Sequence, residues 1–300
     1  MMDVISPNDP SARYVIRSET NQRENNEDSF LAPLIIASHP PVEVMALADG
    51  MGGHAYGEHV SRETLHKVSL ALFDELVAEP SVNGRGEARL MDAEMLGRAI
   101  MNALEQVNDY VIRMVETNKW GKAGSTIVIV GILDDTAVAA NLGDSPLFHY
   151  RRKDGVLVKV TEDHTVAGVL LRAGLISPEM ARFHEGRSRL EFYVGAPKLP
   201  KEAPLHTLRL EPGDLLLLCS DGISGAVPEA TIEAVIGDRQ RDLEKMADGL
   251  IEASLAAGET DNQTLILRQY GGEAPFDTAR SEVTPSTVPS HHAGAGDADL

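Results

Sequence analysis

The stretch "ALADGMGGHAYGEHVS", residues 46–61, decides how this sequence is interpreted. A short apolar run ends in Asp49, glycines follow at positions 50, 52 and 53, and a long amphipathic segment then begins. Residues 42–49 alternate and then turn fully apolar, which is typical of a buried strand. A carboxylate followed by bare backbone can form a tight turn, or it can hold a ligand. Acids placed like Asp49 elsewhere in the chain would favour the second interpretation.

The composition is that of an ordinary soluble globular protein. The chain has 300 residues, of which 43% are hydrophobic and 24% charged. A single cysteine, Cys219, excludes an internal disulfide and fits a reducing cytosol. No segment approaches the roughly 20 apolar residues of a membrane helix, and the N-terminus lacks the layout of a signal peptide. We therefore expect a cytoplasmic protein with no membrane partner.

The charge balance is strongly acidic. Lys and Arg total 27 against 46 for Asp and Glu, which gives a net charge of −19. Such a chain repels nucleic acid at long range, so no nucleic-acid partner is expected. The simplest interpretation of the charge is solubility. The alternative is that some of the acids gather to bind cations. The positions of the acids in the sequence can distinguish between these two interpretations.

The order of predicted elements favours an α+β fold with antiparallel sheets and helices on their outer faces. Strands are expected at 12–18, 29–37, 42–49, 125–133, 136–143, 146–151, 156–161, 205–210, 214–221 and 262–270. Long helices are expected at 58–78 and 91–118, and further helices at 163–176 (capped by Asp163), 228–236 and 242–258. Residues 177–204 are expected to be irregular. Strands and helices do not alternate one by one, which argues against a doubly wound parallel sheet. Residues 1–11 are predicted to form a flexible arm, and 271–300, rich in Gly, Pro, Ser and Ala, a disordered tail.

Acidic residues recur where the predicted strands begin or end. Asp49, Asp144 and Asp221 follow apolar strands, Asp261 precedes the last strand, and Glu27-Asp28 precede the second. Each alone is unremarkable, because Asp is common in turns. If they converge, their repulsion calls for a divalent cation. Oxygen ligands without His or Cys suit Mg²⁺ or Mn²⁺ better than zinc.

Two neighbouring residues fit a site for a phosphoryl group. Gly50, without a Cβ, allows its carbonyl to approach an ion, although a simple turn is the alternative. Arg23 lies four residues before Glu27. It can form a salt bridge with the acids, or it can bind a phosphate bidentately. Two metal ions about 3.5–4 Å apart can hold a hydroxide aimed at phosphorus.

Together these segments resemble the metal-dependent serine/threonine protein phosphatases, the PPM or type 2C family, in its bacterial form. The matching motifs occur in order over residues 12–270: "RENNEDSF" (23–30), "ADGMGGHAYGEHVS" (48–61), "AGSTIVIVGIL" (123–133), "ANLGDSPLFHYR" (140–151), "TEDHTVAGVLLRAGLIS" (161–177), "LLLLCSDGISGAV" (215–227) and "DNQTLILR" (261–268). The resemblance implies one phosphatase domain over 12–270, folded as a four-layer α-β-β-α sandwich of two antiparallel sheets flanked by helix pairs.

The resemblance also implies a metal centre. Two Mn²⁺ or Mg²⁺ ions, with a third and weaker one, would be held directly or through water by Glu27, Asp28, Asp49, Gly50, Asp144, Asp221 and Asp261. Asp49 would bridge the two ions, and Asp144 and Asp221 would share the third. Arg23 would bind the substrate phosphate.

The identity of the general acid is left open by this sequence. The animal branch of the family has a His directly after Asp-Gly, where this chain has Met51. His54 lies nearby and is the candidate, although it can equally pack or cap the helix, and metal-bound water can supply the proton instead. Two further departures are Pro146, where the family usually has Arg, and the flap at 183–197, which is only loosely similar. They bear on substrate choice.

The resemblance implies hydrolysis of phosphoserine and phosphothreonine in proteins by direct attack of a metal-activated water. The implied partners are phosphorylated proteins and a cognate Ser/Thr kinase with its targets. The alternative is a phosphatase-fold scaffold or phospho-reader with little turnover, which retention of all the acids argues against. A two-metal nuclease is a third class, which the net charge of −19 and the lack of a basic stripe disfavour.

Overall fold

The computed structural model describes residues 14–36, 38, 40–52, 55–77, 90–200, 204–238 and 240–271. The predicted arm and, from residue 272 onward, the predicted tail lie outside the described residues, as does His54. None of the described helices is long and apolar enough to cross a bilayer.

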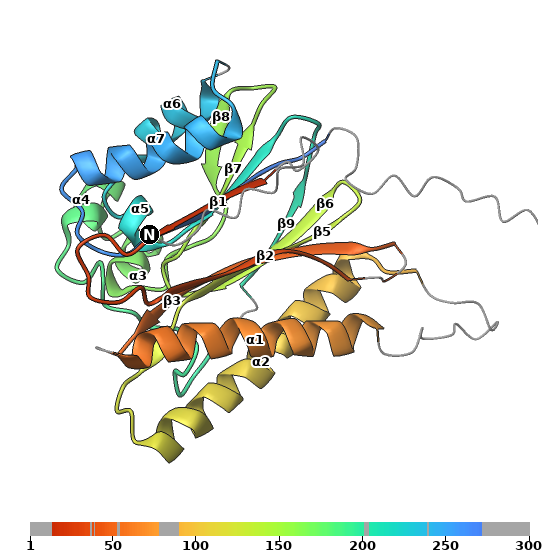
Figure 1. Ribbon diagram of the computed structural model, residues 1–300, viewed down its shortest axis with the longest axis vertical. Coiled ribbons are helices and arrows are strands. Elements are labelled where there is room, and N and C mark those ends of the chain that lie inside the picture. Colours follow the sequence, from red (N-terminus) through yellow and green to blue (C-terminus); the bar gives the residue numbers. More distant parts are fainter. Residues whose placement is uncertain are drawn as a thin grey trace, which may run out of the picture.

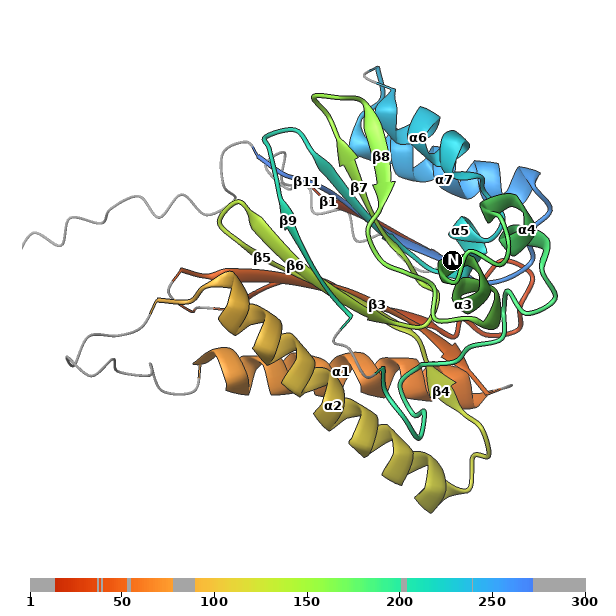
Figure 2. The same ribbon diagram turned by 180° about the vertical axis from the view of Figure 1, so that it is seen from behind.

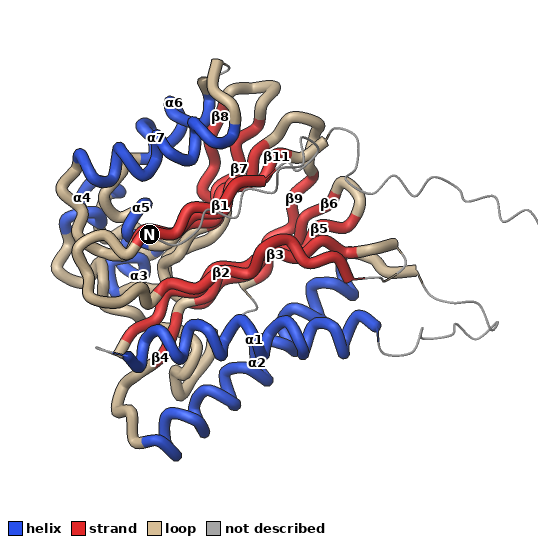
Figure 3. The backbone as a smooth tube through the Cα atoms, viewed as in Figure 1, coloured by secondary structure: helices blue, strands red, loops and turns tan. Residues whose placement is uncertain are grey.

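Two antiparallel sheets form the centre of the molecule (Figure 3). The first sheet has the order β2-β3-β5-β6-β9, with β2 Asp28–Ile36, β3 Val42–Met51, β5 Ile127–Leu133, β6 Thr136–Leu142 and β9 Leu205–Arg209, and β4 (Gly124–Ser125) pairs with the end of β3. The second sheet has the order β1-β11-β10-β7-β8, with β1 Tyr14–Glu19, β11 Gln263–Gln269, β10 Leu215–Cys219, β7 Leu147–Arg151 and β8 Val156–Lys159.

Helices cover both outer faces, which confirms the predicted four-layer sandwich (Figures 1 and 2). The long helices α1 (Ala55–Val77) and α2 (Ala93–Asn118) lie on the first sheet, whereas α6 (Glu229–Gly237) and α7 (Leu243–Ala256) lie on the second. Three apolar clusters fill the three interfaces between these layers. Burial of this apolar area is the main stabilising contribution to the fold.

The central strands explain why their sequences are apolar throughout. All residues of β5, "IVIVGIL", are buried. Ile127 and Ile129 pack toward α1 and α2, whereas Val128 and Val130 between them pack toward the second sheet. Successive side chains of a strand point to opposite faces, so a strand that lies between two packed layers needs apolar residues on both.

Three details differ from the sequence-based prediction. The segment expected to be irregular contains α4 (Pro178–Phe183), which Ser177 caps by accepting from the Met180 amide. The helix expected at 163–176 is the shorter α3 (Val166–Arg172), capped by Thr165 rather than Asp163. The Asp163 carboxylate pairs with Lys159 instead. A one-turn helix, α5 (Asp221–Ser224), follows β10. Helices this short show no measurable periodicity, which is why the pattern did not predict α4 and α5.

Candidate active site

The sandwich brings the strand-terminal acids to one end of the molecule. In an antiparallel pair the end of one strand lies beside the start of the next, so Asp28 at the start of β2 lies directly opposite Asp49 near the end of β3. In the second sheet, Asp221 follows β10 and Asp261 precedes the paired β11. Asp144 follows β6, where the chain crosses between the sheets. The convergence expected from the sequence is thus a consequence of topology.

Hydroxyl groups from the next strand fix the Asp49 segment. The Thr126 hydroxyl accepts from the Asp49 amide at 2.9 Å, and the Thr126 amide donates to the Asp49 carbonyl at 2.8 Å. The Ser125 hydroxyl also donates to that carbonyl at 3.0 Å. Thr126 shares a further hydrogen bond of 2.7 Å with the hydroxyl of Ser145, beside Asp144. The segments that carry Asp49 and Asp144 are therefore held in one network.

A second network links the two sheets through Ser220. Its hydroxyl donates to Oδ2 of Asp28 at 2.8 Å and accepts from the Thr264 amide at 3.0 Å. Ser220 directly precedes Asp221, so this contact places the first-sheet Asp28 beside the second-sheet Asp221. The other carboxylate oxygen of Asp28, Oδ1, is buried and has no hydrogen-bond partner.

The loop before β2 is held by Asn262, the residue after Asp261. The Asn262 side chain donates to the carbonyls of Thr20 and Asn25 and accepts from the Glu27 amide at 2.9 Å. The Glu27 carbonyl in turn accepts from the Gly50 amide at 3.0 Å. Glu27, Gly50 and Asp261 are therefore fixed relative to one another.

Two glycines allow the backbone to approach closely here. A Cβ at position 50 would lie 2.1 Å from the carbonyl oxygen of Gly57. A Cβ at position 57 would lie 2.6 Å from the carboxyl carbon of Glu27. The glycine after Asp49 is therefore required by packing against α1, which the simple-turn interpretation does not explain.

Arg23 makes an ion pair with Asp261, at 2.6 Å between Nη2 and Oδ2. The Arg23 side chain is 54% exposed and that of Asp261 35% exposed, so both are accessible from solvent. Arg23 therefore forms the salt bridge that the sequence analysis gave as one alternative, and it also lies at the edge of the acidic cluster.

The electrostatics of the cluster are those of crowded acids. Burial, and beyond it repulsion from Asp28 and Asp221, raises the pKa of Asp49 well above its usual range. Burial, with repulsion from Asp221, also raises the pKa of Asp144. The pKa of Asp28 is raised to about 7 by burial, although hydrogen bonds from Thr264 and Ser220 oppose the shift. Burial and repulsion from Asp261 raise the pKa of Asp221 to about 6. Each acid thus holds its charge poorly unless a cation compensates it.

The donor set fits a hard divalent cation. The converging groups are carboxylates, and the orphaned Oδ1 of Asp28 is a buried acceptor that lacks a partner. Such a group costs stability unless a ligand satisfies it. In the described part of the chain no three His, Cys, Asp or Glu side chains already have the arrangement of a finished metal site. The fit therefore rests on the chemistry and the crowding of the donors.

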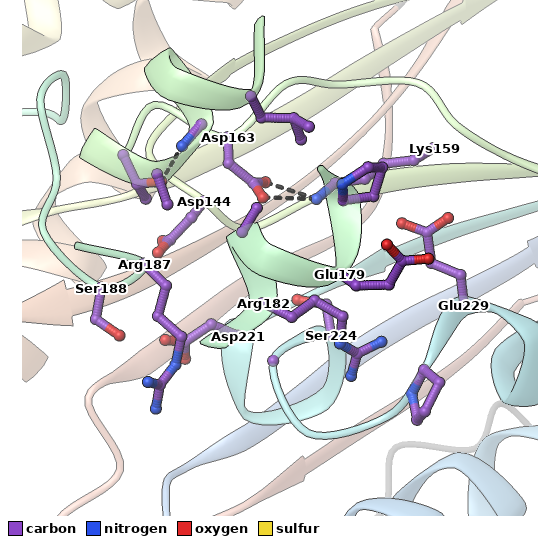
Figure 4. Close-up of a pocket in the computed structure, with 18 of the residues that line it drawn as sticks. Asp144, Lys159, Asp163, Glu179, Arg182, Arg187, Ser188, Asp221, Ser224 and Glu229 are labelled. Atoms are coloured by element: carbon purple, nitrogen blue, oxygen red, sulfur yellow. Dashed lines mark hydrogen bonds and ion pairs between the residues drawn. The ribbon is translucent and has the colours of Figure 1, made fainter. Parts of the chain in front are cut away.

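A pocket opens from this cluster toward α3, α4 and α6 (Figure 4). Its lining includes Asp144, Asp221 and Asp261, together with Arg182 and Arg187 from α4 and the turn that follows it. Of the described residues that line it, none is His or Cys. The pocket can therefore admit a side chain to the acids, and its described lining offers no His or Cys nucleophile.

His164 lies between Asp163 and Thr165, two residues that line this pocket. Its Nδ1 accepts weakly from the Gly143 amide at 3.4 Å, and its own amide donates to the Gly143 carbonyl at 2.9 Å. Burial lowers its pKa to about 4, so it is neutral at physiological pH. A neutral, buried His next to Asp144 serves the turn rather than proton transfer.

Several positioning residues were not predicted as such. They are Gly57, Thr126, Ser220 and Asn262, and each adjoins or contacts one of the predicted acids. Ser220 and Asn262 are sequence neighbours of Asp221 and Asp261, which was the available signal. Their roles depend on contacts between strands distant in sequence, and periodicity does not encode those.

Comparison with known proteins gives a consistent result. Residues 17–259 match the family described as "Protein phosphatase 2C". The serine/threonine phosphatase stp of Listeria innocua is 30% identical over 246 residues, which cover 82% of this chain and 90% of that protein.

Solved structures are similar as well. The crystal structure of the Mycobacterium tuberculosis serine/threonine phosphatase PstP/Ppp has 29% sequence identity and a TM-score of 0.69, covering 87% of this chain and 99% of that one. The catalytic domain of PstP in complex with 2 manganese ions has 28% identity and a TM-score of 0.66, covering 86% of this chain and 97% of that one.

Proposed function

The chain belongs to the protein phosphatase 2C family, and we propose that it is a metal-dependent protein phosphatase that hydrolyses phosphoserine and phosphothreonine in proteins. The observation that carries this is the convergence of Asp28, Asp49 and Asp221, of which Asp221 lines a pocket, with one oxygen of buried Asp28 lacking any partner among the described residues. Crowded oxygen donors of this kind, with a buried oxygen left without a partner, fit the binding of divalent cations.

The ions would be held by the predicted donors, namely Glu27, Asp28, Asp49, Gly50, Asp144, Asp221 and Asp261. When bound, Mn²⁺ or Mg²⁺ ions neutralise these acids, polarise the phosphoryl oxygens and provide an activated water. PstP, which has been crystallised with 2 manganese ions, supports this choice of metal.

The chain's own groups then bind and orient the substrate. Arg23 is exposed beside Asp261, and its guanidinium can hold two phosphate oxygens. The pocket between α3, α4 and α6 admits the phosphorylated side chain. Cys219 takes no part, because burial raises the pKa of its thiol to about 12. The described lining of the pocket offers no His or Cys nucleophile, and we propose direct hydrolysis by the activated water, without a covalent intermediate.

The remaining assignments of the sequence analysis enter the proposal unchanged. His54, which lies outside the described residues, is the candidate general acid, and Asp49 lies at the centre of the acid cluster. The substrates are phosphoproteins, as the names of the relatives support. A cognate Ser/Thr kinase that phosphorylates the same targets, and a cytoplasmic location, follow by analogy.

Hydrolysis of p-nitrophenyl phosphate and of a phosphothreonine peptide with added Mn²⁺ tests the proposal. We expect turnover that EDTA abolishes. Asp221→Asn should lower kcat by at least about 10²-fold, since it removes a charged group from the reaction centre. Asp109→Asn, on the exposed surface of α2, is the matched control and should not change the rate. A folded protein without metal-dependent turnover would instead support the scaffold or phospho-reader alternative.

A further inference from the structure

Two arginines, Arg182 and Arg187, line the pocket beside the acid cluster. Arg182 lies in the last turn of α4, and Arg187 follows five residues later in the turns after that helix. Both belong to the lining that also contains Asp144 and Asp221. In Figure 4 the side chain of Arg187 lies toward the side of the pocket where Asp144 and Asp221 are, and Arg182 lies between it and Glu179.

Both guanidinium groups are uncommitted. Arg182 and Arg187 are exposed, and neither makes an ion pair or a side-chain hydrogen bond among the described residues. Many arginines elsewhere in the described chain are paired with carboxylates, as are Arg17, Arg62, Arg98, Arg172, Arg209 and Arg268. In a protein with 46 acidic and 27 basic residues, Arg182 and Arg187 thus leave two unpaired positive charges beside the candidate active site.

The other charges of the pocket define where an anion could lie. Asp144, Asp221 and Asp261 are assigned to cations in the proposed function, and Asp163 is paired with Lys159. Glu259 also lines the pocket, and its carboxylate accepts from the amides of Thr260 and Asp261. Glu179 and Glu229 lie together on the far side of the pocket in Figure 4. An anionic group is therefore favoured near Arg182 and Arg187, next to the acid cluster, and disfavoured near Glu179 and Glu229.

We infer that Arg182 and Arg187 are specificity-determining residues that select phosphoprotein segments with a second anionic group within a few residues of the phosphorylated Ser or Thr. The inference rests on the proposed function and names its substrate class. The second group is a carboxylate of Asp or Glu, or a second phosphate, because a guanidinium binds both bidentately. Arg23 takes the phosphate that is removed, and Arg182 and Arg187 take its neighbour.

Three peptides that share one phosphothreonine test this. One carries Asp residues on both sides of it, one carries Lys residues there, and one carries a phosphoserine two residues away. With saturating Mn²⁺, kcat and KM are measured separately for the wild type, Arg182→Gln, Arg187→Gln, the double variant and the control Arg113→Gln. The control residue is an exposed arginine of α2, likewise unpaired among the described residues.

The wild type should prefer the Asp peptide over the Lys peptide through KM. Each single variant should reduce that preference by about 2- to 5-fold, the range for an exposed ion pair, and the double variant should remove most of it. Arg113→Gln should keep the wild-type preference. A loss for the phosphoserine peptide alone would identify a second phosphate as the recognised group, and a loss for both would identify any anion.

If the wild type and the double variant show the same preference for the Asp peptide and for the phosphoserine peptide over the Lys peptide, the inference is overturned while the proposed function stays intact. If the wild type hydrolyses neither p-nitrophenyl phosphate nor any peptide, the proposed function itself fails. Binding of the same peptides, measured by fluorescence anisotropy, then tests whether Arg182 and Arg187 recognise the second anionic group. Equal affinities in the wild type and the double variant would count against them.

Discussion

The Arg23 side chain pairs with a carboxylate at this site and is also the proposed ligand of the substrate phosphate. It is exposed, yet its guanidinium lies 2.6 Å from Asp261, a proposed ion ligand. A cation that takes up the Asp261 carboxylate competes for the same oxygen. Ion binding would then release the guanidinium and leave it free for a phosphate, so the two binding events support each other.

Arg23→Ala should therefore weaken substrate binding without weakening metal binding. The variant loses the bidentate phosphate contact, so KM should rise by about 10-fold, within the range of a charge-assisted hydrogen bond. Its Mn²⁺ affinity should stay equal to that of the wild type or increase, because Asp261 loses a competing cation. Isothermal titration with Mn²⁺ and steady-state kinetics measure the two effects separately. A large loss of Mn²⁺ affinity would mean that Arg23 organises the metal site instead.

At the residue scale the sequence was informative about charges and uninformative about hydroxyls. The acids could be predicted because each follows or precedes an apolar strand, and strand ends meet in antiparallel sheets. Thr126 and Ser220 could not, since Ser and Thr are frequent and their partners depend on strand register. Their bonds to Asp49 and Asp28 cross between segments 77 and 192 residues apart.

Among the elements, the first turn of α1 matters most for the site. Gly57 lies in that turn and contacts both the Gly50 backbone and the Glu27 carboxylate. The helix thus comes close to the two loops that carry proposed ligands. Sequence periodicity predicted this helix within a few residues, but it gave no indication that a glycine in its first turn sets the distance to β2 and β3.

Gly57→Ala should leave the protein folded and weaken metal binding. The new Cβ would lie 2.6 Å from the Glu27 carboxyl carbon, and a flexible carboxylate can move away where backbone could not. Displacement of a group that orients the metal shell typically costs about 10- to 100-fold in metal affinity. Mn²⁺ titration and thermal melting check the two parts of this prediction.

Gly97→Ala is the matched control for that experiment. Gly97 lies in the interior of α2, where a Cβ would approach a Leu205 methyl at 3.3 Å, far from the acids. It should keep wild-type Mn²⁺ affinity and gain helix propensity worth up to about 1 kcal/mol. If Gly57→Ala binds Mn²⁺ as tightly as Gly97→Ala, the Glu27 carboxylate has no part in the metal site.

For the molecule as a whole, the crowded acids of the site lower the stability of the metal-free fold, and bound cations would offset that loss. The apolar layers on either side are independent of metal, whereas crowded acids at one end oppose folding once they ionise. The layer order and the end of the molecule at which the acids converge were both predictable from the strand and helix pattern. The contribution of α4 to the pocket, with Arg182 and Arg187, was not predictable, because α4 is too short to leave a periodic signal.

This balance predicts opposite pH trends with and without metal. Asp28 has a pKa raised from 3.8 to about 7 by burial, so its contribution to stability is fully present below pH 3.8 and is lost as pH rises through 7. In EDTA, the melting temperature of the wild type should therefore fall relative to that of Asp28→Asn as pH increases from 5 to about 7.5. With Mn²⁺ the wild type should gain stability over the same interval, because deprotonated carboxylates bind the ion better. Thermal melting of both proteins across this interval, with EDTA and with Mn²⁺, separates the two contributions. A constant difference between the proteins in EDTA would show that Asp28 is already ionised or already satisfied in the metal-free fold, and the account of its orphaned oxygen would then be wrong.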